Sequence, residues 1–495
     1  MKYIVSIDQG TSGTKAIVFD ENGRLVKRES RSHRQFYPKP GWVEHDPEEI
    51  LQNTLSAVDA VVEGSGISPE DVLALAVTNQ RETVVCWDKK TGKPVCNAIV
   101  WQCSRSAQLC DVLKQKGCAD IIFEKTGLTL SPYYSASKMA WILQNVDGAK
   151  KLDDEGNLLF GTMDSWLIYN LTCGECHKTD FSNASRTQLF NINTLEWDEE
   201  LLRIFGIRKS SLPTVCRSDE SFGEAALTCL GGRGIPVAGV LGDSHAALFG
   251  QSCFERGSTK VTYGTGSSIM MNIGEKPFLS KNGLVTSIGW SIGGKTVYVS
   301  EGNINCSAAT IKWLVDDLEL IPDSKSSEKI AESVPDTDGV YFVPAFVGLG
   351  TPYWSSEATA LITGITRGTK KAHIVRAALE AMAFQVRDVL DIMAQEASAS
   401  LSEIRVDGGP SRNSFLLAFQ SDILKTDVVV NELEEICALG AAFAAGLAVG
   451  LWKSQEVFSS LRTADKRFSP KMAETEREKR YKGWQAAICR TLYKP

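Results

Sequence analysis

The chain has 495 residues, of which 43% are hydrophobic and 23% charged, and its formal net charge at pH 7 is −7. A single hydrophobic core stops growing below this length, so we expect a globular protein of two or more domains. The acidic balance argues against a general affinity for nucleic acid or for an anionic membrane surface. We see neither a signal peptide nor an apolar span long enough to enter a membrane, and therefore expect a cytoplasmic protein.

The first predicted element is a β-hairpin. Two β-branched runs, at residues 3–7 and 16–20, flank the segment DQGTSGTK at 8–15. Its glycines allow close backbone approach to an anion, and Asp8 is a hard carboxylate that can hold Mg²⁺ directly or through water. The tip also carries hydroxyl donors and a positive charge: Thr11, Ser12, Thr14 and Lys15. This combination suits a triphosphate, although a surface hairpin with turn-forming residues is the alternative.

A helix and a buried strand follow. The segment Asp46-Pro47 provides an N-cap and a proline at the first helical position, which predicts a helix running towards Val62. Residues 72–78 form a near-continuous apolar run, typical of a strand buried on both faces. Polar residues 79–82 follow it at once. Because open α/β sheets bind ligands at the carboxyl ends of such strands, we expect a ligand site there.

The cysteines do not indicate a disulfide framework. There are 13 of them, an odd and scattered set, which indicates reduced thiols. The segment Cys173-Gly174-Glu175-Cys176-His177 has the spacing of a haem attachment site, but we see no export signal and no second ligand pair nearby. We therefore interpret Gly174 as the turn of a hairpin that follows residues 166–171.

The opening pattern returns in the second half. Residues 235–240 predict a strand, followed by Gly242-Asp243 and a short helix. Residues 259–274 then repeat a β-run, a Gly/Thr/Ser turn and a second β-run, and a further glycine element at 404–409 precedes a helix. We infer a duplicated α/β architecture with two domains, residues 1–250 and 251–495, each presenting a glycine loop to a shared cleft. The run from 471 to 493 predicts a surface helix.

With these elements in place, the chain resembles the FGGY carbohydrate kinase family over nearly its whole length, and most closely its glycerol-phosphorylating members. The resemblance rests on these segments: DQGTSGTK at 8–15, PGWVEHDP at 40–47, TNQRET at 78–83, NAIVWQC at 97–103, LLFGTMDSWLIY at 158–169, NASRTQLFNI at 183–192, GDSHAALFGQ at 242–251, TYGTG at 262–266, VDGG at 406–409 and ALGAAFAAGLAVG at 438–450. It implies two actin-like, ribonuclease-H-like domains with mixed sheets flanked by helices. The polyol would bind on the N-terminal side of the cleft and ATP-Mg²⁺ mainly on the C-terminal side.

The resemblance also implies roles for particular residues. Asp243 would be the general base that takes the proton of the attacking hydroxyl, although an Asp after a Gly at a strand end is equally explained as a helix N-cap. The implied substrate-binding residues are Arg81, Glu82, Trp101, Tyr133, Asp243, Ser244 and Ser268. The implied nucleotide-binding residues are Thr11, Ser12, Gly13, Lys15, Gly264, Thr265, Ala308, Lys312, Gly408, Gly409 and Asn413. Asp8 and Asp243 would hold the metal.

The chain departs from the family pattern at several of these positions. Ser244-His245 stands where the glycerol-phosphorylating members typically have Gln after the catalytic Asp, and Ser268 replaces a Phe of their glycerol pocket. Both changes remove bulk, so a larger or more hydroxylated substrate could fit. Three further departures lie on the nucleotide side: Lys15 replaces an Arg, Lys312 an amide and Ala308 a glycine.

We therefore expect ATP-dependent phosphorylation of a terminal hydroxyl of a small polyol, first of all glycerol to sn-glycerol 3-phosphate. The alternatives are a larger polyol or a ketose (erythritol, threitol or xylulose), a non-catalytic ATP-binding regulatory relative, and an actin- or Hsp70-type ATPase with a protein client. The family resemblance also implies a homodimer or homotetramer.

Overall fold

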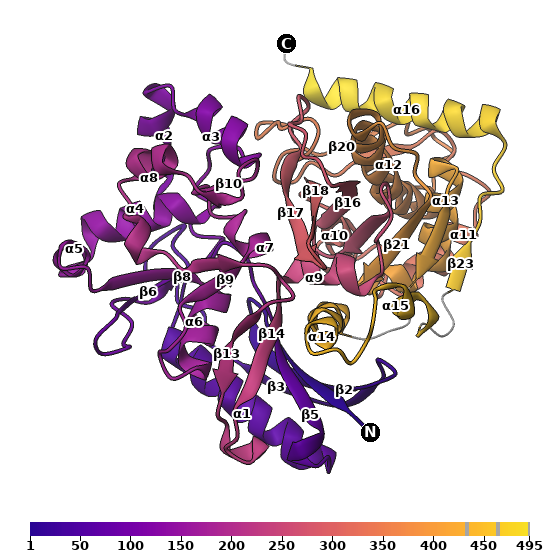
Figure 1. The fold of residues 1–495 in the computed structure, drawn as a ribbon. Helices are drawn as coiled ribbons and strands as arrows, with labels where there is room; N and C mark the ends of the chain where they lie inside the picture. The colour runs from indigo at the N-terminus through magenta and orange to yellow at the C-terminus, as the bar shows by residue number, and fades with distance from the viewer. Residues whose placement is uncertain (431–434, 462–465, 494–495) are drawn as a thin grey trace.

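The fold is that of a computed structural model, which describes residues 1–430, 435–461 and 466–493. Two mixed β-sheets form the centres of two α/β units, one from each half of the chain (Figure 1). In Figure 1 the first half runs from indigo to magenta, and the second half from rose through orange to yellow. The two-domain α/β architecture expected from the sequence is thus present.

The first sheet has six strands in the order β13-β14-β5-β1-β2-β3. Their bounds are β1 (Tyr3–Gln9), β2 (Gly13–Asp20), β3 (Leu25–Ser32), β5 (Val72–Asn79), β13 (Ser221–Ala225) and β14 (Ile235–Gly242). Strands β1, β5 and β14 run parallel, whereas β2, β3 and β13 pair antiparallel with their neighbours. The carboxyl ends of the parallel strands therefore meet at one edge, where the residues that follow β5 and β14 lie close together.

The second sheet repeats this pattern with one additional strand. Its order is β17-β18-β16-β15-β21-β22-β23. The bounds are β15 (Thr259–Tyr263), β16 (Ser267–Gly274), β17 (Val285–Ile292), β18 (Lys295–Ile304), β21 (Glu403–Gly408), β22 (Asp427–Val430) and β23 (Lys466–Phe468). From β18 to β23 the neighbouring pairs are antiparallel, antiparallel, parallel, parallel and antiparallel. The pairs of the first sheet follow the same order from β3 to β13. Each sheet thus opens with a glycine hairpin, β1–β2 in the first and β15–β16 in the second.

Two helices join the sheets. Helix α9 (Asp243–Gly250) packs closely on α14 (Ile436–Ala448), and α14 also contacts β1, β5 and β14 of the first sheet (Figure 1). The close approach depends on glycine, because a Cβ atom on Gly440 would lie 1.8 Å from the carbonyl oxygen of Ala246. A segment that is distant in sequence thus completes the core around the first sheet.

The other elements surround these sheets. The first half adds a four-stranded sheet in the order β4-β7-β6-β8, two strand pairs and several helices. Their bounds are β4 (Glu44–His45), α1 (Pro47–Ser65), β6 (Val84–Asp88), β7 (Ala98–Ile99), α2 (Ala107–Gln115), α3 (Ala119–Thr126), α4 (Ser135–Asn145), α5 (Ala149–Asp154), β8 (Leu158–Thr162), α6 (Met163–Leu171), β9 (Lys178–Asp180), α7 (Phe181–Ala184), β10 (Phe190–Asn191), β11 (Glu196–Trp197), α8 (Glu199–Phe205) and β12 (Thr214–Cys216). The second half adds α10 (Ala308–Asp316), α11 (Ser326–Glu332), β19 (Tyr341–Val343), β20 (Leu361–Thr363), α12 (Lys371–Ala397), α13 (Ser414–Leu424), α15 (Glu456–Ser460) and α16 (Glu474–Leu492).

Most of the predicted elements are confirmed. Helix α1 begins where expected, since the Asp46 carboxylate accepts hydrogen bonds from the backbone N–H groups of Glu48 and Glu49. The hairpin predicted around Gly174 is wrong: residues 163–171 form helix α6, and a turn follows it. This helix is apolar and buried on nearly all sides, so its sequence lacks the polar face that distinguishes an amphipathic helix from a strand. Among the helices of the described residues, none is long and apolar enough to cross a membrane.

Candidate active site

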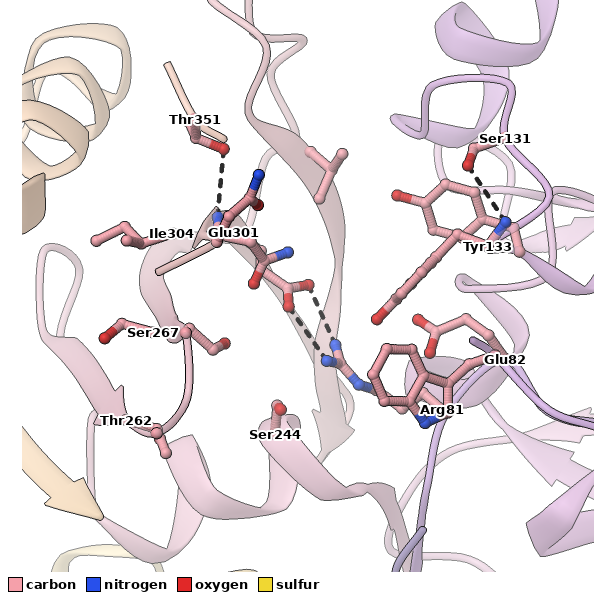
Figure 2. A pocket seen from close by; sticks show the side chains of 18 of the residues that line it. Arg81, Glu82, Ser131, Tyr133, Ser244, Thr262, Ser267, Glu301, Ile304 and Thr351 are labelled. Carbon is pink, nitrogen blue, oxygen red and sulfur yellow. Dashed lines mark hydrogen bonds and ion pairs between the residues drawn. The ribbon is translucent and has the colours of Figure 1, made fainter. Parts of the chain in front are cut away.

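A cavity of about 790 Å³ lies between the two halves, at the tips of the glycine hairpins. Residues of both halves line it, among them Thr11, Arg81, Glu82, Trp101, Tyr133, Asp243, Ser244, Gly264, Ser268 and Glu301. In Figure 2, Glu82 and Tyr133 lie together on one side of this pocket, and Ser267 and Ile304 lie on the other. The structure therefore brings together every residue that the sequence analysis assigned to the substrate.

The first wall combines charge with aromatic surface. Arg81 and Glu82 follow strand β5, and Glu82 adopts a positive φ of 63°, which turns the chain directly after the strand. The rings of Trp101 and Tyr133 meet edge to face, with centroids 5.6 Å apart. The Trp101 indole N–H also donates to the Thr11 hydroxyl at 3.0 Å, so the aromatic wall contacts the first glycine hairpin. Such a wall covers C–H groups, while Arg donates to hydroxyls and Glu accepts from them.

A buried cluster of charges fixes Arg81. Both terminal nitrogens of Arg81 donate to the carboxylate of Glu301 on β18, each at 3.1 Å. Arg186 lies between the two acids, with its Nε 2.6 Å from Glu82 and its Nη1 2.9 Å from Glu301. Burial alone would raise the pKa of Glu301, but the guanidinium groups of Arg186 and Arg81 outweigh it and hold that pKa well below its usual range. A single carboxylate of the second half thus holds two arginines of the first.

The sequence analysis assigned no role to Arg186 or Glu301. Arg186 lies within the segment NASRTQLFNI, which was used only to support the resemblance. Glu301 is the one charged residue in the strand segment from Tyr298 to Ile304, whose other residues are apolar or uncharged. Its side chain is 1% exposed. A charged residue in such a strand is costly to bury without a partner, which is the signal that could have singled it out.

Asp243 is the first residue of helix α9, directly after strand β14. Its Oδ1 lies 3.0 Å from Arg81 Nε and also accepts a hydrogen bond from the backbone N–H of Ser244. One third of the side chain remains exposed, and this part faces the cavity. Asp243 is therefore oriented by fixed donors and still accessible to a ligand, which is what a general base requires.

The tips of the two hairpins supply backbone N–H groups. Each tip is closed by a short backbone hydrogen bond, from Gly10 to Gly13 in the first and from Gly264 to Gly266 in the second. A Cβ atom on Gly266 would lie 2.3 Å from the Ile304 carbonyl oxygen, so no larger residue fits there. Thr11 and Gly264 line the cavity from opposite halves, whereas Ser12 and Gly13 are not among its lining residues.

Lys15 does not point freely into the cavity. Its ammonium group forms an ion pair with the Glu435 carboxylate at 2.6 Å, next to helix α14. This contact connects the first hairpin to the second half of the chain. A phosphate-binding role for Lys15 therefore requires it to leave or share Glu435.

A second hollow of about 650 Å³ adjoins the second hairpin. Three predicted nucleotide-binding residues line it: Thr265, Ala308 and Lys312. The aromatic side chains of Trp313 and Phe346 lie beside them, with ring centroids 5.0 Å apart, and offer a surface for a planar base.

The other predicted nucleotide-binding residues lie outside this hollow. Gly408 ends strand β21 directly opposite Tyr263, which places it beside the second hairpin, and Gly409 follows it. Asn413 caps helix α13, since its side-chain oxygen accepts from the Leu416 N–H at 2.9 Å.

The carboxylate oxygens at and around Asp8 suit a divalent cation. Burial raises the pKa of the Asp8 carboxyl to about 7; Lys15 opposes this shift, whereas the charges of Asp243 and Glu435 add to it. A cation would relieve this crowding of negative charge. No group of three or more His, Cys, Asp or Glu side chains with metal-binding geometry occurs among the described residues. Mg²⁺ does not need such a cage, because it is usually bound by one or two carboxylates together with water and substrate phosphates.

Comparison with known proteins identifies the family. Models of the FGGY family of carbohydrate kinases match the chain twice, the N-terminal domain at residues 3–250 and the C-terminal domain at 259–449. The chain belongs to the FGGY family of carbohydrate kinases. It is therefore an enzyme of the phosphotransferase class, and the resemblance stated from its motifs is confirmed.

The relatives of this FGGY kinase are similar over their full length. It is 51% identical over 492 residues to "Glycerol kinase 2" and 53% identical over 490 residues to "Glycerol kinase 1", both of Thermotoga maritima, with 99% of each chain covered. Its structure matches that of Plasmodium falciparum glycerol kinase with ADP at a TM-score of 0.96 and 39% identity, covering 100% of this chain and 99% of the other. A xylulose kinase from Lactobacillus acidophilus, at 22% identity and a TM-score of 0.88, shares the fold.

Proposed function

We propose that this FGGY kinase transfers the γ-phosphoryl group of ATP to a terminal hydroxyl of glycerol and so forms sn-glycerol 3-phosphate. The observation that carries the proposal is the position of Asp243, 3.0 Å from Arg81 in a cavity that both glycine hairpins and the Arg81–Glu82 wall also line. The names of the full-length relatives favour glycerol over a ketose, since the xylulose kinases among the structural neighbours are only 20–22% identical.

The reaction follows from the roles of these residues. Arg81 and Glu82 bind neighbouring hydroxyls of the polyol, and Tyr133 and Trp101 cover its C–H groups. The terminal oxygen attacks the γ-phosphorus, its proton passes to Asp243, and the bond from the γ-phosphorus to the bridging oxygen of ADP breaks. Backbone N–H groups at the hairpin tips stabilise the phosphoryl oxygens as charge develops on them.

Carboxylates and a second hollow would hold the metal and the nucleotide. Asp8 and Asp243 would hold Mg²⁺, which neutralises charge on the phosphate oxygens when it is bound with ATP. The hollow at Ala308, Lys312 and Trp313 would take the base. In our proposal the enzyme acts in the cytoplasm as a homodimer or homotetramer. Light scattering coupled to size-exclusion chromatography tests the oligomeric state directly.

The experiment is a comparison of ATP consumption by the full chain with and without glycerol, with the product identified by ³¹P NMR. We expect ADP release that depends on glycerol and is matched mole for mole by sn-glycerol 3-phosphate. Hydrolysis to inorganic phosphate at a rate independent of any polyol would contradict the proposal and indicate an ATPase of the actin or Hsp70 type.

A further inference from the structure

A row of polar side chains crosses three neighbouring strands of the second sheet. Thr262 on β15 lies opposite Ser268 on β16, and Ser268 lies opposite Asn303 on β18. Residues directly opposite each other in paired strands project from the same face of a sheet. All three residues line the 790 Å³ cavity, so this polar row forms part of its second wall.

The middle member of the polar row has a buried hydroxyl without a partner. Among the described residues, nothing makes a hydrogen bond to the Ser268 Oγ. Its neighbour Thr262 already accepts a hydrogen bond from the Lys260 ammonium group at 2.8 Å. Buried polar groups are nearly always hydrogen-bonded, so an unpartnered hydroxyl on the wall of a cavity points to a ligand or water that completes it.

The polar row continues the surface that Arg81 begins. Glu301 and Asn303 are two residues apart on β18 and project from the same face, and Glu301 receives both hydrogen bonds from Arg81. Two residues along a strand span roughly 7 Å. The hydroxyls of a triol are already taken by Arg81, Glu82 and Asp243, whereas a longer chain has a further hydroxyl to offer the polar row.

The chemistry of the polar row matches a neutral polyol. Hydroxyls of Thr262 and Ser268 and the amide of Asn303 each donate and accept hydrogen bonds, as alcohol groups do. The cavity is in the size range of sites that hold ligands much larger than glycerol, although part of its volume serves the transferred phosphoryl group. Volume alone would admit many molecules, whereas the paired hydroxyl and amide groups select a hydroxylated one.

We propose that the polar row is a subsite for an additional hydroxyl of the acceptor, so that the enzyme phosphorylates linear polyols of four or five carbons besides glycerol. This inference rests on the proposed function, because it assigns a second group of residues to the same acceptor pocket. The Ser268 hydroxyl supplies the decisive contact, and Asn303 holds the same ligand hydroxyl from the adjacent strand.

The test measures kcat/KM of the full chain with saturating ATP-Mg²⁺ for glycerol, erythritol, the threitols, ribitol, xylitol and the arabitols. At least one of the longer polyols should be turned over with a kcat/KM no less than one tenth of that for glycerol. In Ser268→Ala, the ratio of kcat/KM for that polyol to kcat/KM for glycerol should fall about tenfold, the loss expected for one hydrogen bond between neutral groups. Asn303→Ala should lower the same ratio, and Ser268→Phe, which fills the subsite, should lower it further.

Ser300→Ala is the matched control. Ser300 lies on β18, the strand of Asn303. Like that of Ser268, its buried hydroxyl has no partner among the described residues, but Ser300 does not line the cavity. This variant should leave the ratio unchanged and reports any general effect of losing a buried hydroxyl.

The outcomes separate this inference from the proposed function. Turnover of glycerol without turnover of any longer polyol would overturn the subsite and leave the proposed function intact. Absence of turnover with every polyol would overturn the proposed function itself. If a longer polyol is a substrate but its ratio responds equally to Ser268→Ala, Asn303→Ala and Ser300→Ala, the polar row does not bind it. Asn303 is partly exposed, so Asn303→Ala keeps the test decisive if the Ser268 variants fail to fold.

Discussion

The carboxylate of Glu301 accepts two hydrogen bonds from the Arg81 guanidinium, each 3.1 Å long, although 220 residues separate them in the chain. Arg81 in turn lies 3.0 Å from Asp243. The orientation of the proposed general base thus depends on a contact between the two halves of the chain. Because the arginine is fixed at both ends, the site needs little reorganisation when a ligand binds.

Glu301→Gln should weaken both the fold and the reaction. The change removes one negative charge from a buried cluster that contains Arg81 and Arg186, and leaving a buried charge uncompensated typically costs about 3–5 kcal/mol. We expect a loss of about 3 kcal/mol in the free energy of unfolding, measured in urea, and at least a tenfold fall in kcat/KM for glycerol.

Glu199→Gln is the control for this variant. The Glu199 carboxylate is 67% exposed and lies 3.6 Å from Lys209, so its loss should change the free energy of unfolding by less than about 1 kcal/mol. Equal effects of the two substitutions would show that Glu301 is not a critical partner of the arginines.

Lys138→Met should impair binding of the polyol more than the chemical step. Lys138 is fully buried in helix α4, and its ammonium group donates to the backbone carbonyls of Tyr133 and Tyr134. Methionine keeps most of the volume but leaves both carbonyls unpartnered, so the aromatic wall at Tyr133 loses its fixed position. We expect KM for glycerol to rise about tenfold with a smaller change in kcat, as steady-state kinetics would show. The control is Lys150→Met, at an exposed lysine of α5, which should change neither KM nor kcat for glycerol. An unchanged KM in Lys138→Met would refute the positioning role of Lys138.

Stability should fall on acidification through His45. Burial lowers the pKa of His45 from 6.5 to about 3, and the nearby His33 adds to the shift. Below pH 6.5 the unfolded chain binds a proton at His45 that the folded chain does not, so the free energy of unfolding decreases as the pH falls. At pH 5 this contribution amounts to about 2 kcal/mol.

The measurement is urea unfolding of the wild type and of His45→Gln at pH 7.5 and pH 5. The other titrating groups are present in both proteins, so the difference isolates the titration of His45 together with its coupling to His33. The stability advantage of the wild type should shrink by about 2 kcal/mol between the two pH values. An advantage of the same size at both pH values would mean that His45 titrates normally in the fold.

Local patterns predicted the elements that depend on near neighbours. Alternating β-branched residues and glycine turns marked both hairpins, and Asp46-Pro47 marked the start of α1, because these signals act within a few residues. The family resemblance implied that Asp243 and Arg81 serve one site, and they line one cavity because strands β5 and β14 are parallel neighbours whose ends coincide.

Contacts between distant segments could not be predicted in this way. The pairing of Arg186 with Glu301 and the packing of α14 on the first sheet depend on how the two halves meet. The ion pair of Lys15 with Glu435 is of the same kind, since nothing near Lys15 in sequence indicates it. The error at residues 166–171 has a different cause, because a short segment buried on all sides has no periodicity that separates helix from strand.

Asp243→Asn tests the central claim most directly. Asparagine keeps the size of the side chain but cannot take the proton of the attacking hydroxyl, so kcat with glycerol should fall by about 10²–10⁴-fold. Binding of ADP, measured by isothermal titration calorimetry without Mg²⁺, should remain within threefold of the wild type, because the hollow at Ala308 and Trp313 is separate from Asp243. Loss of phosphoryl transfer with nucleotide binding retained is the result we predict. A variant that keeps more than a tenth of the wild-type kcat would contradict the assignment of Asp243 as the general base.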